Sequence, residues 1–294
     1  MDERMQIPFV KMEGCGNDYI YLNGFEPVVA KFLSSLSEEE LSRWIAGVSD
    51  RHFGIGGDGV ILALPCEGFD GRMRMFNADG SEGKMCGNGI RCVAKLIYDA
   101  GIAKKEILRL MTAAGERLIK VSAENGKLVR AEVDMGAPIW ETKKIPMTLD
   151  LPCFCSAAFQ IGEKEYVGTA VSMGNPHLVI FGDDPDLLDL PAIGPDFEAN
   201  PLFPESVNTE FVQFLSPTHI KMRVWERGSG ETLACGTGAS AVAAAAVRNG
   251  LSPKGEKITL SLTGGDLWIT VTDDTVLMEG PATTVFTGLI ETDI

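Results

Sequence analysis

The sequence predicts an α+β fold with two domains that arise from an internal duplication and are related by a pseudo-two-fold axis. We expect each domain to be a mixed, curled, barrel-like sheet around one central helix. Three observations support this prediction. The 294-residue chain contains a repeat offset by about half its length, each copy carries one helix in the same place, and strand-like segments dominate elsewhere.

The repeat joins Met73–Gly101 to Met222–Gly250, which align without a gap at an offset of 149 residues. Both copies contain the motif C-G-x-G, as CGNG in the first and CGTG in the second. A match of this length and spacing indicates duplication rather than coincidence. The identical pairs are Met73/Met222, Arg74/Arg223, Glu82/Glu231, Cys86/Cys235, Gly87/Gly236, Gly89/Gly238, Val93/Val242, Ala94/Ala243 and Gly101/Gly250.

The order of elements is the same in both copies. A strand-like run (MRMF or IKMRVW) precedes a Gly/Ser/acidic loop, then C-G-x-G, then a helix that ends at a glycine suited to a C′ position. The second helix is apolar nearly all round and should be buried. Residues 256–280 and 126–136 alternate as strands do. A capping box, Ser37 with Glu40, begins a further helix.

These elements divide the chain at residue 133. We expect an N-terminal domain over residues 1–133, completed by the C-terminal segment 281–294, and a C-terminal domain over residues 134–280. The active site is expected in the cleft between the two domains.

Composition excludes several classes of protein. The net charge of −15 argues against a nucleic-acid partner or an anionic membrane surface, because no basic patch supplies phosphate contacts. The longest strongly apolar run, Ala239–Val247, is too short to span a bilayer, and residues 1–10 do not resemble a signal peptide. Seven cysteines, an odd number in a core-rich chain, predict a reducing, cytoplasmic compartment rather than a disulfide framework. Neither a metal nor an organic cofactor is expected.

A glycine-rich segment, Gly54–Gly59 (GIGGDG), formally matches the dinucleotide-binding pattern G-x-G-x-x-G. That pattern requires a strand before it and a helix after it. Here the following residues, VILALP, are strand-like. We therefore interpret the segment as a glycine-rich turn.

The two C-G-x-G motifs carry the chemistry. Each places backbone N–H groups without intrahelical partners at the positive end of a helix, where anions bind and where a thiolate is favoured over a thiol. Two sulfurs that face each other across one ligand could exchange a proton at a stereocentre, one removing it and the other delivering it. Alternatively, each cysteine is a small buried residue in a tight turn. The matched copies favour the reactive pair, and the other five cysteines are interpreted as packing.

The segments FNADGSEGKMCGNGIRC and WERGSGETLACGTGASA resemble those of the diaminopimelate epimerases, which are cofactor-independent amino-acid isomerases. Further blocks along most of the chain, GCGNDYIYL, RHFGIGGDG, GNPHLVIF and PESVNTEFVQ, are also similar and in the same order. The resemblance implies PLP-independent interconversion of LL- and meso-2,6-diaminopimelate, in lysine and peptidoglycan-precursor biosynthesis. It also implies a small-molecule substrate and a homodimer. Proline racemases share only the two C-G-x-G turns.

The resemblance further implies roles for individual residues. Cys86 and Cys235 would be the acid–base pair, and His177 and Glu226 would lie near the thiols, set their protonation and, for Glu226, also contact substrate. Gly87, Asn88, Gly236 and Thr237 would offer N–H groups to the reacting α-carboxylate. The remaining substrate contacts would be Asn17, Asn77, Asn175, Asn208 and Arg227.

Each of these residues also has a simpler interpretation. His177 could be a turn residue, and so could Asn17, Asn175 and Asn208. Glu226 with Arg227 could form a surface ion pair. One position departs from many family members, which carry a substrate-contacting glutamine where this chain has Gly59. Gly59 is therefore not counted as a site residue.

Two other functions remain open from the sequence. One is a racemase or epimerase of the proline or hydroxyproline type, whose ligand would have no distal amino-acid end to occupy Asn77, Asn208 and Arg227. The other is a catalytically silent amino-acid-binding protein, which would need the anion sites but not two thiols. If the thiols face each other, oxidation should inactivate the protein reversibly through a disulfide.

Overall fold

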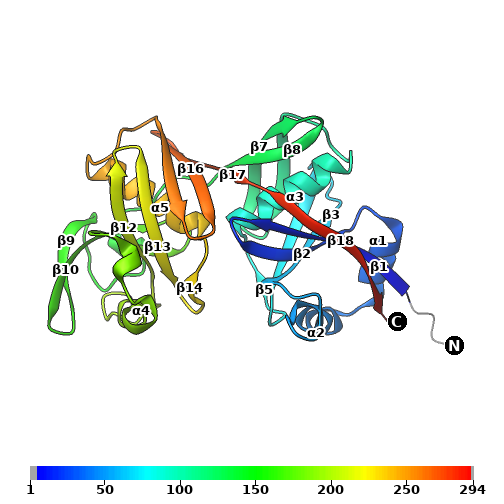
Figure 1. Cartoon of the computed structure of the whole chain (residues 1–294), viewed down its shortest axis with the longest axis horizontal. Coiled ribbons are helices and arrows are strands. Elements are labelled where there is room, and N and C mark those ends of the chain that lie inside the picture. The colour runs from blue at the N-terminus through cyan, green and yellow to red at the C-terminus, as the bar shows by residue number, and fades with distance from the viewer. Residues whose placement is uncertain (1–4, 293–294) are drawn as a thin grey trace. The chain divides into compact units, whose positions relative to one another are not determined.

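The computed structural model describes residues 5–292, and these form two compact units (Figure 1). Unit 1 comprises Met1–Val133 with Gly280–Ile294, and unit 2 comprises Asp134–Glu279. These limits lie within one residue of the domain boundaries expected from the sequence, whose ends at 1–4 and 293–294 fall outside the described residues. No helix of the described residues is long and apolar enough to cross a membrane.

Unit 1 is a mixed sheet wrapped around helix α3 (Gly87–Asp99). β1 pairs with β18 and β2, and β2 pairs in parallel with β3. From β3 the ladder continues through β4, β6, β7 and β8, with only β4–β6 parallel. The strand bounds are β1 Met5–Gly14, β2 Asn17–Asn23, β3 Gly59–Leu64, β4 Gly71–Asn77, β5 Glu82–Gly83, β6 Ile107–Thr112, β7 Gly115–Glu124, β8 Lys127–Asp134 and β18 Thr283–Thr292.

Unit 2 repeats this arrangement around helix α5 (Gly236–Arg248). β10 pairs with β9 and β11, β11 pairs in parallel with β12, and β13 with β15 is the second parallel pair. The fold predicted from the sequence is therefore confirmed. The strand bounds are β9 Phe154–Ile161, β10 Lys164–Ser172, β11 Pro176–Phe181, β12 Asn208–Ser216, β13 His219–Glu226, β14 Gly230–Thr232, β15 Lys257–Leu262, β16 Gly265–Val271 and β17 Val276–Pro281.

The two ladders share one register. In unit 1, Ile61 faces Met75 across β3 and β4; in unit 2, Glu210 faces Val224 across β12 and β13. Both pairs preserve the 149-residue offset of the repeat. The parallel partner of β3 is β2, and that of β12 is β11, so Asn17 and Asn175 precede equivalent positions in the two units. The duplication can therefore be followed residue by residue around each cysteine.

Both central helices are buried because of their composition. All residues from Gly87 to Ala94 are buried in α3, and Gly238–Ala246 is a continuous buried run of small residues with one valine in α5. α5 contacts β10, β11, β12, β15 and β16, so strands surround it on several sides. Small side chains allow this close approach between helix and sheet.

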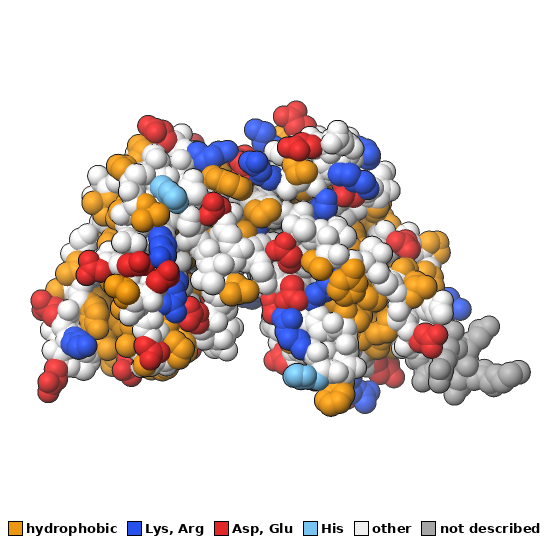
Figure 2. All heavy atoms as spheres, viewed as in Figure 1, with side chains coloured by type: hydrophobic (Ala, Val, Ile, Leu, Met, Phe, Trp, Pro, Cys, Tyr) orange, Lys and Arg blue, Asp and Glu red, His pale blue; other side chains and the backbone are white. Residues whose placement is uncertain are grey.

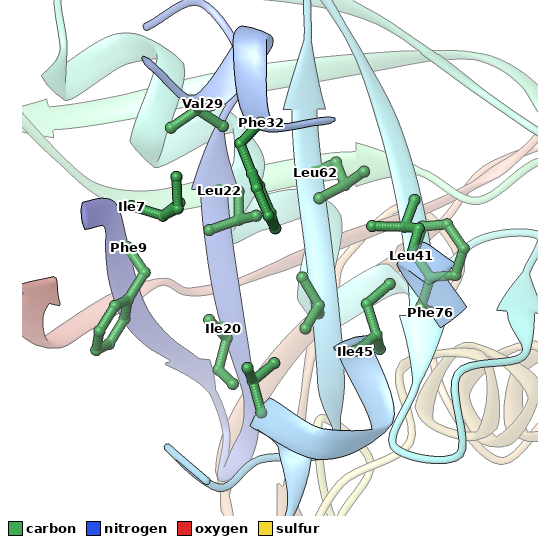
Figure 3. Close-up of a cluster of buried hydrophobic side chains, with 12 residues drawn as sticks. Ile7, Phe9, Ile20, Leu22, Val29, Phe32, Leu41, Ile45, Leu62 and Phe76 are labelled. Atoms are coloured by element: carbon green, nitrogen blue, oxygen red, sulfur yellow. The ribbon is translucent and has the colours of Figure 1, made fainter. Parts of the chain in front are cut away.

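Two further helices cover the outer face of the unit 1 sheet. They are α1 (Pro27–Ser35) and α2 (Glu38–Ser49), and α2 begins with the predicted capping box of Ser37 and Glu40. Figure 3 shows the side chains between these helices and the strands, including Phe32 and Ile45. Each fully buried side chain of this size contributes roughly 1.5–3 kcal/mol. The corresponding helix of unit 2 is α4 (Leu190–Glu198), with short 3-10 turns at Thr142–Lys144 and Pro185–Leu187.

The glycine-rich segment before β3 is a turn, as expected, since a strand follows it and not a helix. Charged side chains lie over the surface of both units. On the face drawn in Figure 2, Lys and Arg are scattered among Asp and Glu.

Candidate active site

Cys86 is the N-cap residue of α3. Its extended backbone (φ −130°, ψ 121°) turns the side chain back over the first turn, where the backbone N–H of Gly89 donates to Sγ at 3.3 Å. The sulfur in turn donates to Oδ1 of Asn17, also at 3.3 Å. Asn17 is held in this orientation because its Nδ2 donates to a carboxylate oxygen of Asp58 at 2.8 Å. The sequence prediction of a thiol at a helix start is thus confirmed in unit 1.

Cys235 occupies the same position at the start of α5. It is the N-cap residue, and the backbone N–H of Gly238 donates to Sγ at 3.4 Å. The hydroxyl of Thr237 lies 3.4 Å from the sulfur, and Nδ2 of Asn175 donates to that hydroxyl at 3.3 Å. Cys235 is buried, whereas Cys86 is half-buried. The two thiols therefore share a backbone setting but differ in solvent access and side-chain partners.

A buried polar pair lies next to Cys235. His177 is fully buried in β11, with Nε2 3.0 Å from Oδ1 of Asn175 and Nδ1 2.6 Å from Oε1 of Glu210. Burial raises the pKa of the Glu210 carboxyl, although His177 partly offsets this. The alternative of a turn histidine is wrong, since His177 is a strand residue within a polar network.

The electrostatics around Cys235 correct one sequence expectation. The start of a helix was expected to favour the thiolate. Instead, burial raises the pKa of Cys235 well above its ordinary value, with further contributions from the carboxylates of Glu226 and Glu210. The N–H of Gly238 and the hydroxyl of Thr237 act in the opposite direction but are outweighed. The helix start alone therefore does not make Cys235 a thiolate.

Hydrogen bonds connect the polar residues at the start of β12 and at the end of β13. Asn208 donates from Nδ2 to the carbonyl of Pro176 at 2.7 Å, and its Oδ1 accepts from the backbone N–H of Arg227 at 3.0 Å. The Arg227 guanidinium donates to the carbonyl of Glu205. Glu226 accepts from the hydroxyl of Thr232. Among the described residues, Glu226 and Arg227 do not form the surface ion pair that the sequence left open.

Asn77 and Gly59 face each other across β3 and β4. Asn77 is exposed and donates to the hydroxyl of Ser81 at 3.0 Å. Gly59 has a φ of +149°, and a Cβ there would lie 1.9 Å from the carbonyl oxygen of Phe76. Any larger side chain at Gly59 would require the strands to move apart, so this chain cannot place a glutamine there without rearrangement.

Comparison with known proteins agrees with this geometry. The family model described as diaminopimelate epimerase matches residues 9–141 and 169–285. The diaminopimelate epimerase of Acetivibrio thermocellus is 48% identical over 285 residues, which cover 96% of this chain and 98% of that protein. The diaminopimelate epimerase of Desulfovibrio desulfuricans is 49% identical over 288 residues, 95% and 96% of the two chains. The chain belongs to the diaminopimelate epimerase family. It is therefore an enzyme of the racemase and epimerase type.

Solved structures share the fold at much lower identity. A hydroxyproline epimerase from Agrobacterium vitis superposes with a TM-score of 0.68 at 13% identity, covering 100% of this chain and 93% of that one. A probable proline racemase from Agrobacterium radiobacter gives 0.67 at 13% identity, with coverage of 98% and 93%. Such distant similarity supports the duplicated fold of the diaminopimelate epimerase family and not the choice of substrate.

Two buried polar residues near the thiols escape sequence reasoning. Glu210 is the third residue of β12, and Arg91 lies in the second turn of α3. Arg91 is fully buried and donates to Oδ1 of Asn88 at 2.9 Å and to the carbonyls of Gly87 and Pro281. For Arg91, the available signal was a charged residue within a predicted central helix.

Cys92, one turn beyond the first motif, behaves as the packing residue that the sequence predicts. It is fully buried, its sulfur lies 3.4 Å from the carbonyl of Glu13, and burial raises its pKa to about 12. Among residues 5–292 there is no cluster of three or more His, Cys, Asp or Glu side chains that could hold a metal ion.

Proposed function

We propose that this member of the diaminopimelate epimerase family interconverts LL-2,6-diaminopimelate and meso-2,6-diaminopimelate by two-base proton transfer at the α-carbon. The observation that carries the proposal is the pair of equivalent thiols, each at the N-cap of a buried helix followed by glycine. It occurs in a chain nearly half identical to curated diaminopimelate epimerases.

In the proposed reaction, one sulfur removes the α-proton as a thiolate and the other, as a thiol, delivers a proton to the opposite face. The carbon passes through a carbanion whose charge extends onto the α-carboxylate. Backbone N–H groups of Gly87, Asn88, Gly236 and Thr237 then stabilise that charge, because the starts of α3 and α5 leave such groups without intrahelical partners. The proposal requires both sulfurs to reach one α-carbon.

The groups around each sulfur support acid–base roles. Cys86 donates to Asn17, as a thiol must, and the sulfur of Cys235 is within reach of the hydroxyl of Thr237. His177 and Glu226 would adjust the protonation of Cys235, and Glu226 lies close enough to raise the pKa of that thiol. General acid–base groups placed in this way typically contribute 10²–10⁴-fold to rate.

The distal amino-acid end of the substrate would be bound by Asn77, Asn208 and Arg227, together with Asn17 and Asn175. Arg227 offers a guanidinium for bidentate carboxylate contact. Asn208 would act mainly by holding the backbone of Arg227, since both ends of its amide already have protein partners.

We also propose a cytoplasmic homodimer. Within residues 5–292 the seven cysteines are not paired in disulfides, which suits a reducing compartment. Strand β18 exposes Val285, Phe286 and Leu289, with 55%, 46% and 61% of each residue accessible. Sedimentation or light scattering should give twice the 31.6 kDa chain mass, and Phe286→Asp should shift it toward one chain.

Isotope exchange tests the reaction. The reduced protein is incubated with LL-diaminopimelate in deuterated water, and NMR follows loss of the α-proton and appearance of the meso isomer. We expect both, with no exchange of trans-4-hydroxy-L-proline under the same conditions. Absence of exchange from LL-diaminopimelate would contradict the proposal, and exchange of hydroxyproline alone would favour a racemase of the proline type.

The cysteine variants test the two-base mechanism in the same assay. Cys86→Ala and Cys235→Ala should each reduce epimerisation by about 10³-fold or more, whereas the matched control Cys92→Ala should retain it. Full activity in either of the first two variants would exclude a two-base role.

A further inference from the structure

Glu210 is a buried carboxylate in unit 2, and the equivalent position of unit 1 holds an apolar side chain. The shared register of the two ladders makes Ile61 its counterpart in unit 1. Both residues are fully buried. A buried carboxyl group costs free energy unless it is hydrogen-bonded. Because only unit 2 has a carboxyl group at this position, we look for its function there.

The carboxyl group begins a continuous hydrogen-bond chain. Oε1 of Glu210 is 2.6 Å from Nδ1 of His177, and Nε2 of His177 is 3.0 Å from Oδ1 of Asn175. Nδ2 of Asn175 donates to the hydroxyl of Thr237, and that hydroxyl lies 3.4 Å from the sulfur of Cys235. Four contacts thus connect a fully buried carboxyl group to the reacting sulfur.

The orientation of Asn175 gives this chain a direction. Since Nδ2 of Asn175 faces Thr237, Oδ1 faces His177 and must accept a hydrogen from Nε2. The hydroxyl of Thr237 accepts from Asn175 and so has its own hydrogen free to donate to the sulfur of Cys235. The donors from His177 to Thr237 therefore point toward Cys235, and the hydroxyl of Thr237 can donate in the same direction.

Glu210 determines whether His177 can keep that hydrogen on Nε2. The 2.6 Å contact between Nδ1 and Oε1 requires one shared proton, and with the Nε2 hydrogen the pair has no net charge. Burial, which raises the pKa of the Glu210 carboxyl, favours such a neutral pair. The second oxygen, Oε2, is buried and has no hydrogen-bond partner among the described residues, so the pair with His177 is the principal anchor of this group.

The carboxyl group of Glu210 also packs closely against the first turn of α5. A Cβ on Gly238 would lie 2.7 Å from Oε1 of Glu210 and 3.3 Å from the sulfur of Cys235. Oε1 and the sulfur are therefore separated by no more than the sum of these distances. Glycine at this position lets the carboxyl group, the helix start and the thiol pack together.

The groups that act on Cys235 can now be assigned. From α5 come the N–H of Gly238 and the hydroxyl of Thr237, which favour the thiolate; from β13 comes the carboxylate of Glu226, which opposes it. From β12 comes the carboxylate of Glu210, which also opposes the thiolate when it is charged; the proton that it shares with His177 of β11 leaves the pair without net charge and offsets that effect. Among these groups, Thr237 is thus the only neutral side chain that can donate to the sulfur. The orientation of its hydroxyl depends on the hydrogen bonds that run from Glu210 through His177 and Asn175.

We propose that Glu210 is a positioning residue that fixes His177 in the tautomer whose hydrogen-bond chain through Asn175 and Thr237 donates to Cys235 and so favours its thiolate. The proposal deepens the two-base function proposed above and rests on it for its catalytic meaning. Its physical content, the coupling of Glu210 to the sulfur, can be measured without any substrate.

The test is the pH dependence of alkylation of Cys235 by iodoacetamide, with Cys86 measured in parallel by peptide mass spectrometry. The pH midpoint reports ionisation, whereas the limiting rate reports access to the sulfur. The variants are Glu210→Ile, which places the unit 1 residue in unit 2, Thr237→Val, which removes the hydroxyl and keeps the backbone, and the double variant. Circular dichroism confirms that each is folded.

We expect each single substitution to raise the Cys235 midpoint, so that alkylation below the midpoint slows about three- to tenfold. The double variant should show no more than the larger single effect, because both changes interrupt one chain. The Cys86 midpoint should not move. An unchanged or lowered Cys235 midpoint in Glu210→Ile, or additive effects in the double variant, would overturn the proposal.

If Glu210→Ile fails to fold, a measurement on the unaltered protein tests the proposal instead. The ¹⁵N spectrum of the histidine rings, with His177 assigned through His177→Asn, should show Nε2 of His177 protonated at neutral pH. An unprotonated Nε2 would contradict the proposal. If the unaltered protein shows no epimerase activity but the alkylation midpoints change as expected, only the proposed reaction is contradicted.

Discussion

The two cysteine sites share a backbone and differ in polarity. Asn17 and Asn175 precede equivalent ladder positions, yet Asn17 accepts a hydrogen bond from the sulfur of Cys86, whereas Asn175 donates to the threonine that lies against Cys235. The duplication has therefore preserved the frame that presents a thiol at a helix start. The side chains that control protonation have diverged, so the two thiols are not chemically interchangeable.

The second turn of each central helix also combines an equivalent backbone position with a different side chain. Arg91 in α3 and Ser240 in α5 occupy equivalent positions, and each donates to the carbonyl of the glycine after the cysteine, Gly87 or Gly236. One unit uses a buried guanidinium for this contact and the other a hydroxyl. The comparison suggests experiments in which matched substitutions are made in both units.

The largest difference is expected at this pair. Arg91→Met should lower the free energy of unfolding by about 3 kcal/mol, because several buried acceptors, including Oδ1 of Asn88, lose their donor. Ser240→Ala should cost about 1 kcal/mol, the usual net value of one hydrogen bond. Urea denaturation measures both, and equal losses would show that the guanidinium contributes no more than the hydroxyl.

The last glycine of each C-G-x-G motif, Gly89 or Gly238, gives the next contrast. In Gly238→Ala the new Cβ would lie 2.7 Å from the Glu210 carboxyl, which His177 holds; in Gly89→Ala it would lie 2.5 Å from the terminal methyl of Ile61. The methyl can rotate away, but the carboxyl would have to leave its partner. We expect losses of about 2–3 and about 1 kcal/mol, and the reverse order in thermal unfolding would refute this explanation.

The two helices should also differ in how the stability that they contribute depends on pH. The counterpart of Cys92 in α5 is Ala241, and both are fully buried. Because the pKa of Cys92 is raised from 9.0 to about 12 in the folded protein, the unfolded chain loses this proton first as pH rises. Its contribution to stability is therefore complete below about pH 9 and declines above it, by about 1.4 kcal/mol per pH unit.

Cys92→Ala should remove that component. Its unfolding free energy should fall less steeply between pH 9 and 11 than that of the wild type, in chemical denaturation at fixed ionic strength. Parallel curves for the two proteins would show that Cys92 ionises normally in the folded state.

The smallest effects belong to the repeated surface ion pairs. Arg74 binds Glu82, and Arg223 binds Glu231 at the equivalent positions. Arg74 has a second carboxylate partner in Glu38, whereas Arg223 otherwise donates to main-chain carbonyls. Glu231→Gln should therefore cost up to about 1 kcal/mol and Glu82→Gln about half as much. Both losses should shrink in 1 M salt, and insensitivity to salt would argue against an ionic origin.

The sequence predicted the features that recur in its own repeat. The 149-residue offset was sufficient to identify the duplicated fold, both thiols and both helix starts, because these depend on local backbone chemistry that glycine and capping positions record. It also suggested His177 and Asn175 through family resemblance.

The departures from the repeat could not be predicted in this way. Glu210 appears in the sequence as one charged residue in a strand of mixed polarity, and nothing local shows that its side chain reaches His177 on the neighbouring parallel strand. The expectation that a helix start favours the thiolate also fails at Cys235, where burial outweighs the helix start and the carboxylates of Glu226 and Glu210 add to its effect. Such effects depend on tertiary contacts; the His177–Glu210 contact, for example, joins residues 33 positions apart in the chain.

The pairing of β18 with β1 has a consequence for biosynthesis. Unit 2 is continuous in sequence, so all of its strands have been synthesised once β17 ends at Pro281. Unit 1 must wait, with one edge of β1 open, until Thr283–Thr292 has left the ribosome. The half of the protein that is translated first is thus completed last, and during elongation its unpaired strand edge is the place where nascent chains are most exposed to misassembly.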